Sequence, residues 1–344
     1  MTGALTGVTA EEAWADYRTA AAAAGVSVRT VSVDDAWAAV ALLEEIWKAR
    51  PVEAALLISL AHTGGYAVVA VDAEVVAGDS NEEVASGEDG EKANRDSAGR
   101  DAVLGAAAGY FAQPVGTALH SHVAGVRPGI ERPGVGRAMK LHQRAWCLDL
   151  GVTEVTWTFD PLVARNAHIN LTRLGADFDE YLVDFYGVMT DGINAGQGSD
   201  RAVLRWHLTR PYLPIPRGGQ VADQHGGPPG DQCGSTQNSA SAEGTPGADL
   251  RRAGTGDVRH DEPVAAPALV VAPDGAPRRN PVPASGDVTL AIPRDIEGLR
   301  ATDPAQASAW RTALRETMTP LLADGWRVTG FEPATGYLVE RPTP

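Results

Sequence analysis

Cysteine is scarce in this 344-residue sequence, and long apolar runs are absent from it. The two cysteines, Cys147 and Cys233, stand in a predicted helix and in a Gly/Pro-rich stretch, so we expect no disulfide and a reducing compartment. No stretch approaches the ~18 apolar residues of a membrane-spanning helix. The first residues lack the basic start and apolar core of a signal peptide. We therefore expect a soluble, cytoplasmic protein.

Basic residues are outnumbered, because 29 Lys and Arg stand against 44 Asp and Glu, for a formal net charge of −15. Such a surface repels nucleic acid and anionic membranes, and we expect neither as a partner. It would tolerate or weakly attract a cationic small molecule. No Cys/His group has zinc spacing, so no metal is expected, and no G-x-S-x-G elbow occurs.

Composition divides the chain into four parts. Residues 1–25 form a predicted N-terminal helix, and residues 26–212 a main domain in which the acidic stretch 79–101 is a flexible loop. Residues 213–285, rich in Gly, Pro and Ser, are predicted to be a disordered linker. Residues 286–344 read as a strand, a helix and a hairpin that pack on the main domain. The sequence does not fix the oligomeric state, and a homodimer is one option.

Periodicity and capping residues predict the order of elements in the main domain. Thr9 and Glu12 form a capping box at the first helix, which Gly25 ends. The predicted elements then follow as a strand at 28–33, a helix capped by Asp34 and Asp35, a helix from Pro51, strands at 66–76 and 103–114, a long helix after Gly136, a strand at 152–159, a shorter helix closed by Gly175, and strands at 179–189 and 201–208. On the long helix, Arg144 and His142 are interpreted as surface residues.

The most informative stretch is the turn before the long helix. It reads Glu-Arg-Pro-Gly-Val-Gly-Arg from residue 131 to 137. Gly134 and Gly136 allow a close approach of the backbone to a ligand. The unpaired amides and the dipole at a helix N-terminus favour an anion such as a pyrophosphate, which Arg132 and Arg137 flank. A dinucleotide fingerprint needs a glycine where Met139 stands, and the Gly-Lys-Ser/Thr of a P-loop is absent.

The run V-x-P, a short turn, G-x-G and a long helix resembles the acyl-CoA-binding turn of the GNAT superfamily of N-acyltransferases. Gly134 and Gly136 match that signature, whereas Glu131 takes the leading position and Pro133 stands where an arginine is common. The order of predicted elements also resembles the GNAT fold, as does the sequence NAHINLTRLGA after VTWTFDP. The resemblance implies an α/β (α+β) fold with a mixed, mostly antiparallel central sheet flanked by helices, followed here by a small C-terminal α/β segment.

The same resemblance implies acetyl-CoA or another acyl-CoA as co-substrate. Backbone groups around Val126 would hold the pantetheine arm like an extra strand, and Asn166 would face it. The pyrophosphate would lie on the turn, at Arg132, Gly134, Val135, Gly136 and Arg137.

Candidate catalytic residues are harder to choose. The strand before the turn offers His120 and His122, two residues apart and hence on one face, and an imidazole suits proton abstraction near neutral pH. Both could instead be structural, bonding across the sheet. Many relatives carry a tyrosine where Leu171 stands. A phenol could come instead from Tyr186, or from Tyr181 or Tyr110, although each also reads as a packed aromatic residue.

The sequence thus predicts an acyl-CoA-dependent N-acyltransferase that acts directly on a small amine of unknown identity. A second hypothesis is a non-catalytic acyl-CoA sensor or assembly module, because Glu131, Pro133 and Leu171 depart from the family pattern. A third is that the C-terminal segment binds a partner. A fold does not name its substrate, so the acceptor stays open.

Overall fold

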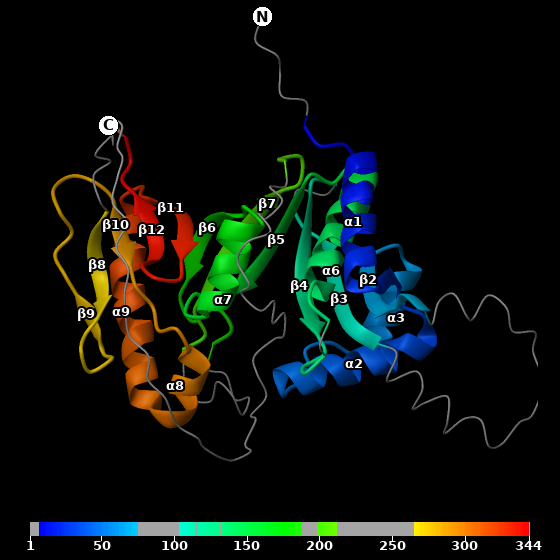
Figure 1. Cartoon of the computed structure of the whole chain (residues 1–344), viewed down its shortest axis with the longest axis horizontal. Helices are drawn as coiled ribbons and strands as arrows, with labels where there is room; N and C mark the ends of the chain where they lie inside the picture. Colours follow the sequence, from blue (N-terminus) through cyan, green and yellow to red (C-terminus); the bar gives the residue numbers. More distant parts are fainter. Residues whose placement is uncertain are drawn as a thin grey trace, which may run out of the picture.

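A computed structural model describes residues 7–74, 103–113, 116–130, 132–187, 198–211 and 265–343. The predicted loop at 79–101, Glu131 and most of the predicted linker lie outside these residues. The described chain contains a seven-stranded sheet in the order β1-β2-β3-β4-β5-β7-β6 and a five-stranded sheet in the order β11-β12-β10-β8-β9 (Figure 1). The first sheet is mixed and mostly antiparallel, which confirms the predicted fold class.

The helices and strands have the following bounds. The helices are α1 (Ala10–Ala24), α2 (Val33–Trp47), α3 (Ala54–His62), α6 (Val135–Asp149), α7 (Ala164–Ala167), the π-helix η1 (His168–Arg173), α8 (Ile296–Thr302) and α9 (Pro304–Ala323). The first sheet comprises β1 (Val26–Thr30), β2 (Tyr66–Asp72), β3 (Val103–Phe111), β4 (Ala118–Val126), β5 (Glu154–Phe159), β6 (Asp177–Leu182) and β7 (Arg201–His207). The second comprises β8 (Ala266–Val271), β9 (Pro277–Arg279), β10 (Val288–Leu290), β11 (Arg327–Glu332) and β12 (Gly336–Glu340).

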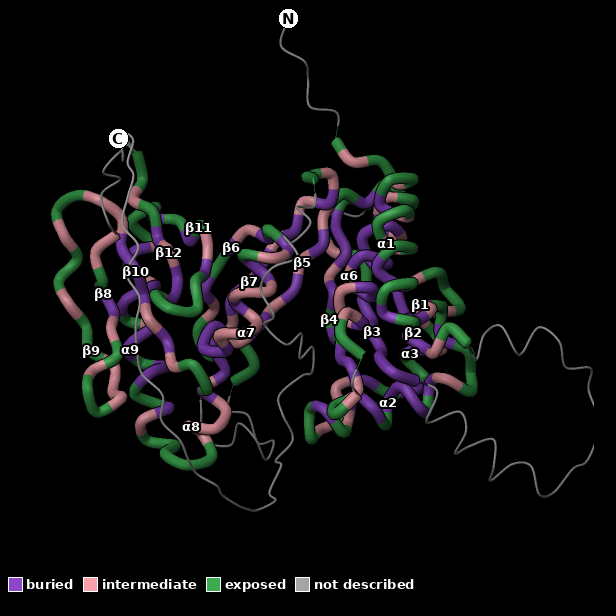
Figure 2. The backbone as a smooth tube through the Cα atoms, viewed as in Figure 1, coloured by how far each residue is buried: buried purple, intermediate pink, exposed green. Residues whose placement is uncertain are grey.

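Helices cover the two faces of the first sheet unequally. On one face, α2 and α3 pack on alternate residues of β2 and β3, such as Val69 and Ala106. On the other, α1 and α6 pack on residues such as Val68 and Leu119, and this core continues through β5 and β7 into the C-terminal sheet (Figure 2). As predicted, β2 is buried on both faces. By contrast, β5 and β7 alternate between buried residues and half-buried ones.

Capping chemistry explains several element boundaries. The capping box of Thr9 and Glu12 is present, and Gly25 ends α1 in the left-handed region at φ 65°. The prediction for α2 was wrong in detail, because Ser32 and not Asp34 caps it. Asp35 completes a second capping box with Ser32, so the preceding strand ends earlier than predicted. The third helix likewise begins at Ala54, beyond Pro51.

Two polar residues of α6 that were interpreted as surface residues are buried. Arg144 has no exposed area; its Nε and Nη2 donate to the carbonyl oxygens of Leu208 (2.9 Å) and Arg210 (2.6 Å). His142 is enclosed by the rings of Trp14, Tyr17 and Tyr66. Both corrections have one cause: α1 packs against α6 and covers a face that helical periodicity alone leaves to solvent.

The ordered C-terminal part begins earlier than predicted. Strands β8 and β9 lie inside the range 213–285 that was predicted to be linker. Residues Ala268 and Leu269 of β8 are fully buried, and β8 lies between β9 and β10 in the sheet. The apolar run at 268–271 is too short to stand out against a Gly/Pro-rich background.

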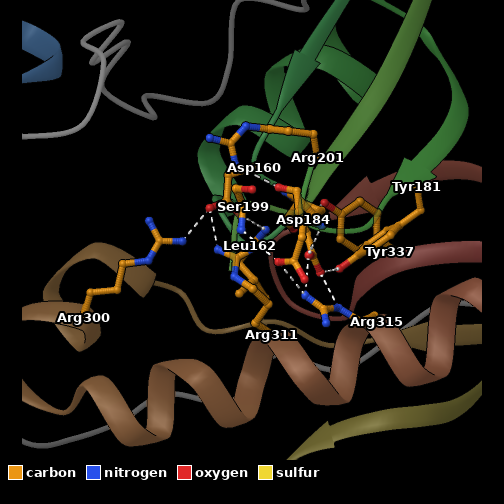
Figure 3. Close-up of polar contacts among 12 residues, drawn as sticks. Asp160, Leu162, Tyr181, Asp184, Ser199, Arg201, Arg300, Arg311, Arg315 and Tyr337 are labelled. Atoms are coloured by element: carbon orange, nitrogen blue, oxygen red, sulfur yellow. Dashed lines mark hydrogen bonds and ion pairs between the residues drawn. The ribbon is translucent and has the colours of Figure 1, made fainter. Parts of the chain in front are cut away.

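An ion network around Asp160 joins the first sheet to the C-terminal helices (Figure 3). Asp160 follows β5 and accepts hydrogen bonds from Arg300 of α8 (2.5 Å) and Arg311 of α9 (2.7 Å). Burial alone would raise the pKa of Asp160, but the charges of Arg311 and Arg300 hold it well below its usual range. Beside it, Arg315 pairs with Asp200 (2.6 Å). The junction is therefore stabilised by ion pairs as well as by the shared hydrophobic core.

Candidate functional site

The two parallel strands β4 and β5 pair over only three positions. Their register runs from Ala118 opposite Glu154 to His120 opposite Thr156. Beyond this point β4 continues to Val126 with β3 alone as its described neighbour, and β5 continues to Phe159 with β7 alone. We call the region between these facing, unpaired edges the β4–β5 wedge. Because free backbone N–H and C=O groups line it, an extended ligand could add there as a strand.

A β-bulge lies on β4 beside the apex of the wedge. Ser121 pairs with Gly109 and Val123 with Ala108, so His122 has no residue opposite it on β3. The bulge re-aims the side chains of β4, as bulges next to active sites do. In consequence His120 and His122 both lie against the ring of Tyr110, at 5.3 Å and 5.7 Å between ring centres. The two histidines share a face, as predicted.

The face of the wedge away from α6 carries the imidazoles and phenols. Nδ1 of His120 lies 3.2 Å from Oγ1 of Thr156, across the last β4–β5 pair. Burial lowers the pKa of His120, and the neighbouring charges of His122 and Lys140 lower it further. This imidazole is therefore neutral near pH 7 and able to accept a proton.

Tyr186 stands on the β5 side of the same face. Its hydroxyl lies 3.4 Å from Oγ1 of Thr158, and the guanidinium of Arg201 lies 5.0 Å from its ring centre. Burial raises the pKa of Tyr110, and the nearby Tyr186 raises it further. Tyr181 is set apart: it is buried and donates to Asp200 (2.7 Å).

The α6 face of the wedge holds a lysine that is not among the candidate residues chosen from the sequence. Nζ of Lys140 lies 3.2 Å from Oγ of Ser121 on β4 and 4.4 Å from the ring centre of Trp157 on β5. It also donates to Oε1 of Gln143 (3.1 Å). Burial lowers the pKa of Lys140 to about 8. Ser121 on the strand and Gln143 three residues along the helix were the signals that could have identified it.

The glycine turn lies at the open end of the wedge, because β4 runs away from the apex toward it. Gly134 is the N-cap of α6 at φ 96°, a conformation that favours glycine, and no side chain caps the helix. The first amides of α6, at Val135, Gly136 and Arg137, therefore have the arrangement of a helix N-terminus that can bind an anion. Arg137 lies in this first turn and is half-buried.

Three other residues predicted to bind a cofactor lie on different elements. Arg132 forms an ion pair with Asp72 of β2 (2.5 Å) and donates to the carbonyl oxygen of Gly25 (3.3 Å), so part of its role is to hold the turn against α1 and β2. Asn166 lies on α7, the helix that follows β5, and is half-buried. Val126 is the last residue of β4.

The described part of the chain offers neither a metal site nor a membrane span. Within it, no three His, Cys, Asp or Glu side chains are grouped so that they could hold a metal ion. None of its helices combines the length and the apolar character that crossing a membrane requires.

No family model and no curated protein matches this chain. Several solved structures are similar to it. One, from Desulfovibrio desulfuricans and described as an acetyltransferase of the GNAT family, is 17% identical with a TM-score of 0.35, over 53% of this chain and 99% of that one. An acetyltransferase-type structure from Salmonella typhimurium with its cofactor acetyl-CoA is 14% identical, with a TM-score of 0.37, over 56% and 99%. The ribosomal-protein-S18-alanine N-acetyltransferase of Escherichia coli is 14% identical, with a TM-score of 0.37, over 54% and 96%.

Proposed function

We propose that this protein is an acyl-CoA-dependent N-acyltransferase that transfers an acyl group, acetyl in the first instance, directly from the thioester to a small amine. One observation carries the proposal. The unpaired edges of the β4–β5 wedge lead from a cluster of proton-transfer groups at the apex to an uncapped helix N-terminus at the mouth.

The wedge matches the donor in shape and polarity. The pantetheine arm is extended and carries two amides, which suit the free backbone groups of Ser121–Val126. The pyrophosphate at its far end suits the amides that begin α6. With the arm along β4 and the phosphates at Gly134, the thioester reaches the apex, between His120 and Lys140.

The acceptor would approach on the face that α6 does not cover. His120 and His122 lie there, and the half-buried Thr156 and Thr158 continue the surface along β5. When Nδ1–H of His120 donates to Thr156, Nε2 carries the lone pair. One of the two imidazoles then takes a proton from the amine as the new C–N bond forms and the C–S bond breaks. Holding donor and acceptor together supplies most of the remaining rate enhancement.

The test is to incubate the protein with acetyl-CoA and a panel of small amines, and to follow both free CoA and the acetylated amine by mass spectrometry. We expect both products in equal amounts with at least one amine, and a loss of about 100-fold in kcat when His120 and His122 are both replaced by Ala. Binding of acetyl-CoA without turnover of any amine would favour the sensor hypothesis, which the buried Leu171 in place of a tyrosine motivates.

A further inference from the structure

Lys140 is the side chain that approaches both strands where they separate. Its ammonium group contacts Ser121, one residue beyond the last β4 pair, and the ring of Trp157, one residue beyond the last β5 pair. It therefore stands at the apex on the α6 face, opposite the imidazole of His120. The thioester sulfur that the proposed function brings to the apex would lie between these two groups.

A purely structural role accounts poorly for Lys140. Among the described residues no carboxylate pairs with it, so this half-buried ammonium is partly desolvated without an ion pair. Ser121 already accepts a hydrogen bond from Nε2 of Gln143 (3.2 Å). Arg144, one turn further along α6, is by contrast a structural residue: its guanidinium donates hydrogen bonds to backbone carbonyls and to Asp16.

We propose that Lys140 is the general acid of the reaction and donates its proton to the departing CoA thiolate. This assignment rests on the proposed function. It places the proton donor on the face opposite the acceptor, so that the amine attacks from one side of the sheet and the thiolate leaves toward the other.

The step balances. The amine nitrogen forms a bond to the carbonyl carbon and loses one proton to an imidazole, while the electrons of the C–S bond go to sulfur. Lys140 gives one proton to that sulfur and becomes a neutral amine. The imidazolium then loses its proton to solvent and the lysine regains one, so that the products are an N-acyl amine and free CoA.

The ionisation of Lys140 suits this role. Burial lowers its pKa to about 8, close to the ~8.5 of an ordinary thiol. The titratable groups that act on it are Cys147 of its own helix, whose pKa burial raises to about 12, and His120 across the sheet. Neither is charged near pH 7. Lys140 is therefore protonated at pH 7 and loses its proton above about pH 8, where a general acid would cease to act.

The first test compares kcat against pH for the wild type, Lys140→Met, Lys140→Arg and Lys48→Met, which is the same substitution at the exposed C-cap of α2. We expect Lys140→Met to lower kcat by about 100-fold and to lose the decline above about pH 8, with Lys48→Met unchanged. Lys140→Arg keeps the charge but does not release a proton, so it should not restore turnover. Full kcat in Lys140→Met, beside an active wild type, would overturn the assignment and leave the proposed function standing. An inactive wild type would overturn both.

The second test needs no turnover. Isothermal titration at about pH 8 compares free CoA with desulfo-CoA, which lacks the thiol. We expect the wild type to bind CoA more tightly than desulfo-CoA, because the protonated lysine stabilises the thiolate, and Lys140→Met to bind the two equally. Equal affinities in the wild type would place the sulfur away from Lys140 and overturn the proposal.

Discussion

The β4–β5 wedge and the junction around Asp160 each hold positive charge partly or fully out of solvent, but the charges have different partners. At the junction, Arg300 and Arg311 share the carboxylate of Asp160. In the wedge, the hydrogen-bond partners of Lys140 within the described part of the chain are the neutral side chains of Ser121 and Gln143. A paired charge holds two parts of the molecule together, whereas an unpaired one costs stability and is chemically active. The ion pairs thus stabilise the junction, whereas the charge of Lys140 is available for the proposed proton transfer.

The largest effect is expected when the carboxylate of Asp160 is removed from the junction. Asp160→Asn leaves two buried arginines without their carboxylate, and we expect it to lower the free energy of unfolding by about 3–5 kcal/mol in urea denaturation. The pKa of Asp160 is depressed in the folded state, so its contribution is present above the ordinary value of 3.8 and is lost only as the pH falls through the lowered pKa. The loss should thus stay constant from pH 7 down to about pH 5.

Asp179→Asn is the matched control for that experiment. Asp179 pairs with Arg205 (2.8 Å), but its side chain is 40% exposed, so its removal should cost less than about 1 kcal/mol. Equal effects of the two variants would mean that the junction is not a buried charge network.

In the wedge, we expect a substitution of the charged residue to raise the free energy of unfolding. Lys140→Met removes a half-buried charge that has no ion pair among the described residues, and we expect it to raise the free energy of unfolding at pH 7 by about 1–3 kcal/mol while it lowers kcat. Because the folded-state pKa of Lys140 is about 8, below its unfolded value, the advantage of the variant should shrink as the pH rises from 8 toward 10. Urea denaturation at several pH values measures this, and a destabilised variant at pH 7 would show that Lys140 is structural.

A substitution of Gly134, at the mouth of the wedge, is expected to have a smaller effect on stability. Gly134→Ala forces a side chain into a left-handed conformation at φ 96°, and we expect a cost of about 1–2 kcal/mol in unfolding free energy, with weaker acetyl-CoA binding. Gly116→Ala, also at positive φ with open space around it, is the control: it should cost a similar amount and leave binding unchanged. A loss of acetyl-CoA affinity in both variants would show that the turn at Gly134 has no specific role in binding the ligand.

Local chemistry could be predicted from the sequence, whereas burial that depends on distant packing could not. The capping box of Thr9 and Glu12 and the glycine that begins α6 are set by neighbouring residues. Arg144 and His142 were misjudged because α1, more than a hundred residues away in sequence, covers them. The pairing of His120 and His122 on one face was predicted from strand alternation, although the bulge at His122 also shapes it.

The least predictable feature was the importance of Lys140. Its sequence neighbours on α6, Arg137 and Arg144, suggest a basic stripe, and only the short β4–β5 register shows that Lys140 lies at an apex.

If an acyl-CoA occupies the β4–β5 wedge, hydrogen exchange with and without acetyl-CoA will detect it directly. We expect acetyl-CoA to slow exchange at the amides of Ser121–Val126 that do not pair with β3 and at the first turn of α6, with β8–β12 unchanged. Unchanged exchange along β4 at saturating acetyl-CoA, or protection confined to another part of the chain, would contradict the account.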